Sequence, residues 1–190
     1  MNTPQEILSF WFGEPRGKRQ KAWFEKSPAF DADVRARFLR PYCVVSGDGD
    51  AALTPWMNAA TNALALIVLT DQLPRNMFRG TPQAFASDPV ALAAAKHCVA
   101  CGWDAQMLPV ERMFLYLPFE HSEVLADQVR AMELFEPLNA YPETDGTPEY
   151  ARRHWEIILR FGRFPHRNAI LGRTNTPEEA EFLKQPGSRF

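Results

Sequence analysis

The stretch RFGRFPHRNAILGR, residues 160–173, gathers basic and polar side chains in a chain whose formal net charge is -2 at pH 7. It contains four arginines, a histidine and an asparagine, and no acidic residue. Planar guanidinium groups bind carboxylates and phosphates through paired hydrogen bonds. The stretch therefore predicts a site for a small anionic molecule, with charge supplied by Arg163, Arg167 and Arg173 and orientation by His166 and Asn168.

Two histidines lie on the apolar stripes of predicted helices. At ~100° per residue, His154 falls in the middle of the apolar face of 148–161. On 120–136 the same count turns His121 and Gln128 inward. It sends outward Glu123, Asp127 and Arg130. Because histidine titrates near neutral pH, His121 and His154 are the candidate general base or acid if there is catalysis. The alternative for each is a hydrogen-bonded residue of the core.

A carboxylate falls on the apolar face of the predicted helix 55–72. Asp71 lies there in the last turn, where the helix end carries partial negative charge. A buried carboxylate without a partner is costly, so a cation is expected near Asp71. The basic stretch offers Arg167 for this role, in which case Asp71→Asn should rescue much of the stability lost in Arg167→Met. Arg75 is a candidate ligand-binding residue, since DQLPRN at 71–76 echoes GRFPHRN at 162–168 and the two turns converge if the fold is an array of helical hairpins. Coincidence of helix-ending residues is the alternative.

Helical phase turns one acid inward, Asp71, against three arginines of the basic stretch. We therefore expect at least one of these arginines to have no acidic partner and to be available to an anion. Removing such an arginine should cost little stability, because like charges repel one another in the empty site. If instead the arginines brace the turn after 148–161, each removal should be destabilising.

Other motifs have little support as functional sites. Cys98 and Cys101 have the spacing of a redox pair, but they lie at a predicted helix C-terminus, which raises rather than lowers a thiol pKa. Only Cys43 remains as a further thiol, too few for a structural zinc site. His121 and Glu123 are two residues apart and point in different directions on a helix. No metal site and no cofactor are expected.

Composition predicts a single globular domain over residues 1–190, since 46% hydrophobic and 23% charged residues are ordinary values. The longest apolar run, ALALIVL at 63–69, is far shorter than a membrane span. The N-terminus has none of the features of a secretory signal, so a cytoplasmic protein is expected. The small net charge and the single short basic stretch argue against nucleic-acid binding.

Repeated Ser-Pro, Thr-Pro and Asp-Pro pairs are typical of helix starts, where the first residue caps a backbone N–H and proline suits the first turn. Glu6 and Glu179 follow their threonines by three residues and complete capping boxes. Apolar residues recur at three and four positions, so the protein is predicted to be all-α. About eight helices are expected, at 4–12, 29–42, 55–72, 89–101, 109–117, 120–136, 148–161 and 177–184.

Several long segments resemble the bacterial domain of unknown function 924 family. They are ILSFWFG (7–13), WFEKSPAFD (23–31), ALALIVLTDQLPRNMFRGTPQAFASDPVAL (63–92), ERMFLYLPFEHSE (111–123), DQ (127–128) and FGRFPHRNAILGRTNTPEEAEFL (161–183). The resemblance covers nearly the whole chain. It implies a tetratricopeptide-like superhelix of α-hairpins and supplies neither a reaction nor catalytic residues.

Three hypotheses for function remain. The first is a protein that binds a small phosphate or carboxylate compound in a polar pocket. The second is a protein-binding helical scaffold without catalysis, whose protein partner is open. The third is a metal-dependent enzyme that uses Asp71, His121, His154 and His166. The sequence does not decide whether the protein is an enzyme.

Overall fold

The computed structural model describes residues 3–47 and 50–188. Over these residues the regular structure is helical and contains no strand, which confirms the all-α prediction. The α-helices are α1 (Pro4–Phe12), α2 (Pro28–Gly47), α3 (Asp50–Leu53), α4 (Ala60–Ile67), α5 (Leu73–Met77), α6 (Asp88–Ala100), α7 (Pro109–Glu120), α8 (Leu125–Phe135), α9 (Thr147–Phe161) and α10 (Pro177–Phe182). Each predicted helix has a counterpart in this set.

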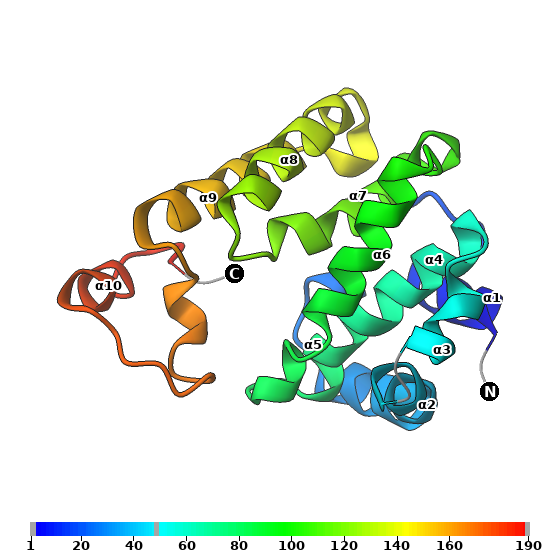
Figure 1. Ribbon diagram of the computed structural model, residues 1–190, viewed down its shortest axis with the longest axis horizontal. Coiled ribbons are helices and arrows are strands. Elements are labelled where there is room, and N and C mark those ends of the chain that lie inside the picture. Colours follow the sequence, from blue (N-terminus) through cyan, green and yellow to red (C-terminus); the bar gives the residue numbers. More distant parts are fainter. Residues whose placement is uncertain (1–2, 48–49, 189–190) are drawn as a thin grey trace.

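The helices pack mainly against neighbours that are close in sequence (Figure 1). Helix α4 packs between α1 and α6, α6 also contacts α7, and α7 contacts α8, which lies along α9. Helical pairs of this kind are compatible with a tetratricopeptide-like arrangement. Beyond α9 the chain forms a C-terminal arm, residues 162–188, which includes a short 3-10 helix (Pro165–Arg167) and α10. The arm lies on the opposite side of the molecule from α1 and α3 (Figure 1).

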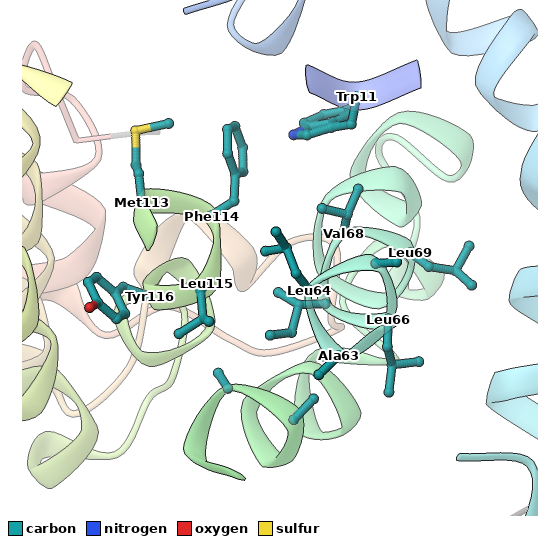
Figure 2. Packing of buried hydrophobic residues seen from close by; sticks show 14 of the residues in the cluster. Trp11, Ala63, Leu64, Leu66, Val68, Leu69, Met113, Phe114, Leu115 and Tyr116 are labelled. Carbon is teal, nitrogen blue, oxygen red and sulfur yellow. The ribbon is translucent and has the colours of Figure 1, made fainter. Parts of the chain in front are cut away.

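The main core is built from apolar faces of α1, α2, α4, α6, α7 and α8. Trp11 of α1 meets Phe114 of α7 edge to face, with ring centroids 5.4 Å apart. Figure 2 shows these two rings together with Val68 and Leu64, which lie on the side of the neighbouring helix that faces them. Such aromatic pairs stabilise by about 0.5–1.5 kcal/mol beyond the burial of their area. These contacts fix the positions of α4 and α7 relative to each other.

A second, smaller core fixes the C-terminal arm. Ile157 and Ile158 of α9 pack with Phe164, and Phe161 and Phe182 cover them. The rings of Phe161 and Phe182 have centroids 5.0 Å apart, so α10 is held against the end of α9. The arm is therefore attached to α9 by apolar contacts of its own. The single-domain organisation of residues 1–190 stays a prediction.

Several predicted helix ends are confirmed. Thr3 and Thr176 each accept a hydrogen bond from the backbone N–H three residues on, and Glu6 and Glu179 complete the two capping boxes. Gly162 ends α9 in the left-handed conformation at φ 67° and donates its N–H to the carbonyl of Ile158. Glycine suits this position because it has no Cβ to clash there.

The predicted helix 120–136 is wrong in its first turn. Helix α7 continues to Glu120, and α8 begins only at Leu125. The break follows from Ser122, whose Oγ accepts a hydrogen bond from the Val124 N–H and donates to Asp127 Oδ2 at 2.8 Å. Serine side chains compete with helix backbone in this way. His121 is therefore the residue that caps the C-terminus of α7, and it lies in a turn.

The predicted helix 55–72 is also interrupted. A short 3-10 helix (Thr54–Trp56) precedes α4, and a π-helical segment (Val68–Gln72) follows it. Pro74 has no N–H to donate to the carbonyl four residues earlier, at Thr70. That carbonyl accepts a hydrogen bond from Ser87 Oγ instead, while Thr70 Oγ1 donates to the carbonyl of Leu66. Such π segments occur frequently at functional sites.

No helix within the described residues has both the length and the apolar content of a membrane span.

Candidate functional site

Asp71 is fully buried, as the sequence predicts, and it has two basic neighbours. Its Oδ1 lies 2.8 Å from His121 Nδ1 and 3.4 Å from a guanidinium nitrogen of Arg75. Burial alone would raise the pKa of Asp71, but Arg75 and His121 outweigh burial and lower it to about 2. Asp71 is therefore ionised at neutral pH, and the arginine that pairs with it is Arg75, whereas Arg167 pairs with Asp88.

Arg75 connects Asp71 to a second acid at the start of α6. Its two terminal nitrogens donate to the two carboxylate oxygens of Asp88 at 2.9 and 3.2 Å. One of them also donates to the backbone carbonyl of Asp71. Paired contacts of this geometry are among the stronger hydrogen bonds in proteins. Arg75 is thus held firmly between the π segment and α6.

Arg167 reaches the same acid from the C-terminal arm, but its contacts are weaker. The shortest distance between its guanidinium and Asp88 is 3.5 Å. The group lies between the rings of Phe85 and Phe164, with centroids at 4.8 and 4.6 Å. Its side chain is only 8% exposed, and its Nε has no hydrogen-bond partner among the described residues. Burial and the nearby Arg75 lower the pKa of Arg167 to about 10.

His154 lies on the inner face of α9, as the sequence predicts. Its Nδ1 is 2.8 Å from the carbonyl of Tyr150 and 3.1 Å from Oε1 of Glu120. Burial lowers the pKa of His154 to about 3. Burial and the charge of Asp71 raise the pKa of Glu120 to about 8. The two side chains therefore meet as a neutral pair at neutral pH, because each loses its charge in this interior.

These contacts close into a ring of side chains, which we call the interior ring. Arg167 stacks on Phe164, Phe164 lies 5.5 Å from His154 between ring centroids, and His154 lies 6.4 Å from His121. The members in order are Asp71, Arg75, Asp88, Arg167, Phe164, His154 and His121. Solvent still reaches the ring, since the side chains of Arg75 and His121 are 21% and 14% exposed.

Two more predicted site residues support the ring from outside. His166 lies against Phe164 at 5.6 Å between centroids, and burial together with Arg167 lowers the pKa of His166 to about 4. Gln128 of α8 is fully buried, and its Nε2 donates to the carbonyls of Glu120 and Ser122, each at 2.6 Å. Gln128 therefore fixes the turn that carries His121.

The other three predicted residues hold the C-terminal arm together. Arg163 makes two hydrogen bonds to Glu179, at 2.6 and 2.8 Å. Arg173 makes two to Glu123, at 2.7 and 2.9 Å. Asn168 donates to the side chains of Asn175 and Glu179 and accepts from Arg173, and it is fully buried. These three residues lie outside the ring.

The acids that meet the arginines were not found by helical phase, and this corrects the expectation of a single inward acid. Glu123 was predicted to face outward, but it lies in the turn before α8, where it also accepts a hydrogen bond from the Phe164 N–H. Asp127, also predicted outward, is buried and pairs with Lys96 at 2.6 Å. All three arginines have an acidic partner among the described residues, so the expectation of an arginine without one is wrong; the pair of Arg167 with Asp88, at 3.5 Å, is the weakest of the three.

Sequence reasoning missed Phe85, Asp88 and Glu120 as neighbours of the site. The aspartate-proline pair at Asp88 predicts only the start of a helix. It contains no information about the partners of the Asp88 carboxylate. Glu120 could have been found if α7 had been extended by one turn, since Glu120 then lies next to His121 at the buried end of that helix. Phe85 had no recognisable signal.

Other candidate features lie apart from the ring. Within residues 3–47 and 50–188, no three or more histidine, cysteine, aspartate or glutamate side chains are placed to hold one metal ion. Cys98 is buried, and burial raises the pKa of its thiol to about 12. A surface cavity of about 160 Å³ contains none of the predicted site residues and is lined by Arg16, Ala60, Thr61, Leu64, Gln106, Met107 and Glu111.

Fold and site together define an all-helical protein in which a buried ring of ionisable side chains joins the C-terminal arm to the helices before it. Residues 7–187 match the family model described as bacterial protein of unknown function (DUF924), so the chain belongs to that family. The solved structure of a protein of unknown function from Agrobacterium tumefaciens is similar, with a TM-score of 0.83 and 38% identity over 96% of this chain and 97% of that chain. No curated protein matches the chain.

Proposed function

We propose that this protein binds a small anionic molecule, a carboxylate or phosphate compound, at the interior ring. The observation that carries the proposal is the state of Arg167. Its guanidinium is buried, has a hydrogen-bond donor with no partner among the described residues, and lies 3.5 Å from an acid that Arg75 already engages. A buried cation in this state is costly unless a further acceptor satisfies it.

The contrast with its neighbours supports this role for Arg167. Arg163 and Arg173 each make two short hydrogen bonds to a carboxylate, so each already has an anionic partner in the paired geometry. Arg167 instead lies between two aromatic rings, which keep its planar group in place without consuming its donors. A preorganised guanidinium is suited to two parallel hydrogen bonds with a carboxylate or phosphate.

His166 and His121 are the remaining groups that would line the bound anion in this proposal, and Arg75 acts through the two acids that it holds, Asp71 and Asp88. His166 lies against the ring of Phe164, on which the guanidinium group of Arg167 is stacked. Asn168, Arg163, Arg173 and Gln128 act indirectly, because their observed contacts hold the arm and the turn in position.

A second candidate function is proton transfer, and the contact between Asp71 and His121 favours it. A buried carboxylate that accepts from Nδ1 of a histidine orients the ring and leaves Nε2 to act as a general base. His154 is less suited to this role, because its Nδ1 already contacts the Tyr150 carbonyl and Glu120.

The structure supports the other two hypotheses, a protein-binding scaffold and a metal-dependent enzyme, less well. A protein-binding scaffold requires the basic stretch to be bracing only, which the contacts of Arg163 and Arg173 fit and those of Arg167 do not. A metal-dependent enzyme gains no support from the geometry of the described residues. A cytoplasmic protein that does not bind nucleic acid remains our proposal, in keeping with three cysteines outside disulfides and a net charge of -2.

Thermal unfolding in the presence of phosphates and small carboxylates tests the leading proposal. An anion at about a hundredfold excess over its dissociation constant stabilises the native state by ~2.7 kcal/mol, which corresponds to a rise in Tm of roughly 5–10 °C for a chain of this size. The rise should vanish in Arg167→Met. It should persist in Arg160→Met, which removes an exposed arginine and so matches the change in net charge. Equal shifts in both variants would reject the ring as the anion site.

A further inference from the structure

We infer that the anion bound at the interior ring also donates a hydrogen bond, to Nε2 of His121. The ligand class is then a hydrogen phosphate, or a carboxylate that has a hydroxyl group beside it, and anions without a proton to donate are discriminated against. This inference rests on the proposed function and adds chemical selectivity to it. It follows from the protonation pattern that the neighbours of His121 enforce.

Asp71 determines which nitrogen of His121 holds the proton. An ionised carboxylate can only accept hydrogen bonds, so the contact at 2.8 Å requires a hydrogen on Nδ1. In a neutral imidazole the other nitrogen, Nε2, then has a lone pair and acts as an acceptor. The second oxygen of Asp71 accepts from the side-chain amide of Gln72, which holds the carboxylate in this orientation.

The surroundings favour the neutral form of His121. Arg75 already compensates the charge of Asp71, and it contacts Asp71 through both the carboxylate and the backbone carbonyl. Burial and the charge of Arg75 lower the pKa of His121, and this outweighs the opposing influence of Asp71 and Asp88. With His121 neutral, the charges of Arg75 and Arg167 are balanced by those of Asp71 and Asp88, and a charged imidazole would add a positive charge without an acid of its own.

Nε2 of His121 is available to a ligand. Among the described residues, the side chain of His121 makes its hydrogen bond to Asp71 through Nδ1, and 14% of that side chain remains exposed. The turn that carries it is held by Gln128 and by the Ser122 to Asp127 hydrogen bond. The acceptor therefore has a fixed position on the interior ring.

Nε2 of His121 is a fixed hydrogen-bond acceptor, and Arg167 is a fixed cation on the same ring. Together they distinguish anions of equal charge by whether the anion has a proton to donate. An anion with a proton can place its oxygens on Arg167 and its hydrogen on Nε2. An anion without one must bring a lone pair against a lone pair and leave Nε2 without a donor. Sites built around a hydrogen bond reject analogues that cannot form it. We expect a preference on the order of tenfold or more.

Isothermal titration calorimetry at constant ionic strength and pH 8 tests the inference with inorganic phosphate and sulfate, which then have the same charge but differ by one proton. Glycolate and acetate provide a second pair. The native protein should bind phosphate and glycolate at least roughly tenfold more tightly than their counterparts. This comparison needs no variant, so it stands even if a substitution impairs folding.

Asp71→Asn and Asp88→Asn form a matched pair. Each removes one carboxylate beside Arg75, but only Asp71 contacts His121. The side-chain amide introduced by Asp71→Asn can donate to Nδ1 and shift the proton of His121 to Nε2, so the preference for phosphate over sulfate should shrink or reverse. Asp88→Asn also removes the acid near Arg167, so it should change the affinity for both anions but keep the preference for phosphate over sulfate. Nitrogen-15 spectra should show a proton on Nδ1 of His121 in the native protein and on Nε2 in the Asp71→Asn variant.

The outcomes separate this inference from the proposed function. If phosphate and sulfate bind equally well and Arg167→Met abolishes both, the anion site stands and the inference is wrong. A proton on Nε2 of His121 in the native protein would also overturn it. If no anion binds, the proposed function fails and the inference fails with it. A roughly tenfold preference that Asp71→Asn alone removes supports both.

Discussion

Arg167 differs from the other arginines of its stretch in a way that only its contacts reveal. Arg163 and Arg173 are satisfied by carboxylates, whereas Arg167 is buried between two rings and near an acid at 3.5 Å. A buried charge that is poorly paired does not stabilise a fold, and replacing it by an apolar side chain is often neutral or stabilising. The stability of the empty protein therefore reports whether Arg167 is structural.

Arg167→Met should change the free energy of unfolding by less than about 1 kcal/mol, or increase it, because methionine keeps the apolar contacts with Phe85 and Phe164. Arg173→Met should lose about 1–3 kcal/mol, because it leaves Glu123 half-buried without its paired donors. Urea unfolding without added anions measures both. A loss in Arg167→Met as large as that in Arg173→Met would make Arg167 a structural brace.

At the scale of elements, the turn between α7 and α8 decides where His121 points. Residues 121–124 are not helical, and the side chains of Ser122 and Gln128 replace the hydrogen bonds that a continuous helix would have made. The orphan carbonyls at the end of α7 need such donors because they have no partner within the helix. The direction of His121 therefore depends on α8 as much as on α7.

Gln128→Met should destabilise the protein by about 1–3 kcal/mol, because it removes the donor from the carbonyls of Glu120 and Ser122. Gln83→Met is the control, since Gln83 is exposed, and its effect should stay within about 0.5 kcal/mol. Hydrogen exchange should also quicken at residues 121–124 in Gln128→Met alone. Equal stability of the two variants would mean that the turn holds without Gln128.

At the scale of the whole molecule, buried ionisable groups make stability depend on pH. The folded-state pKa of Glu120 is raised to about 8, so the folded protein retains a proton there that the unfolded chain loses above about 4.5. The contribution of Glu120 to stability therefore falls as pH rises from about 4.5 to 8. Asp71 acts in the opposite sense, because its folded pKa is lowered to about 2 and its contribution is lost as pH falls from about 4 to 2.

Glu120→Gln should remove the loss of stability at higher pH, because glutamine keeps the shape of a protonated glutamate and has no proton to lose. Relative to this variant, the native protein should lose up to ~1.4 kcal/mol per pH unit between about pH 5 and 8, and level off above about pH 8. Urea unfolding across this range measures the difference. Parallel pH curves for the two proteins would show that Glu120 is ionised in the fold.

Much of the secondary structure was predictable because it depends on neighbours in the chain. The capping boxes at Thr3 and Thr176 and the glycine after α9 involve residues within a few positions of one another. The burial of Asp71 and His154 was predictable for a related reason, since helical phase places a side chain on the apolar face whatever that face packs against.

The sequence by itself thus determined that the chain is all-α and that an acid and a histidine point inward. Only the tertiary structure decided which charges meet. Glu123 pairs with Arg173 across 50 residues, and Arg75 and Arg167 converge on Asp88 from two different segments. Spacing along one helix contains no information about such pairs. The paired segments are far apart in the sequence, and they meet only because the apolar faces of their helices pack together. That packing leaves Arg167 with a buried donor that has no partner among the described residues, while carboxylates engage Arg163 and Arg173.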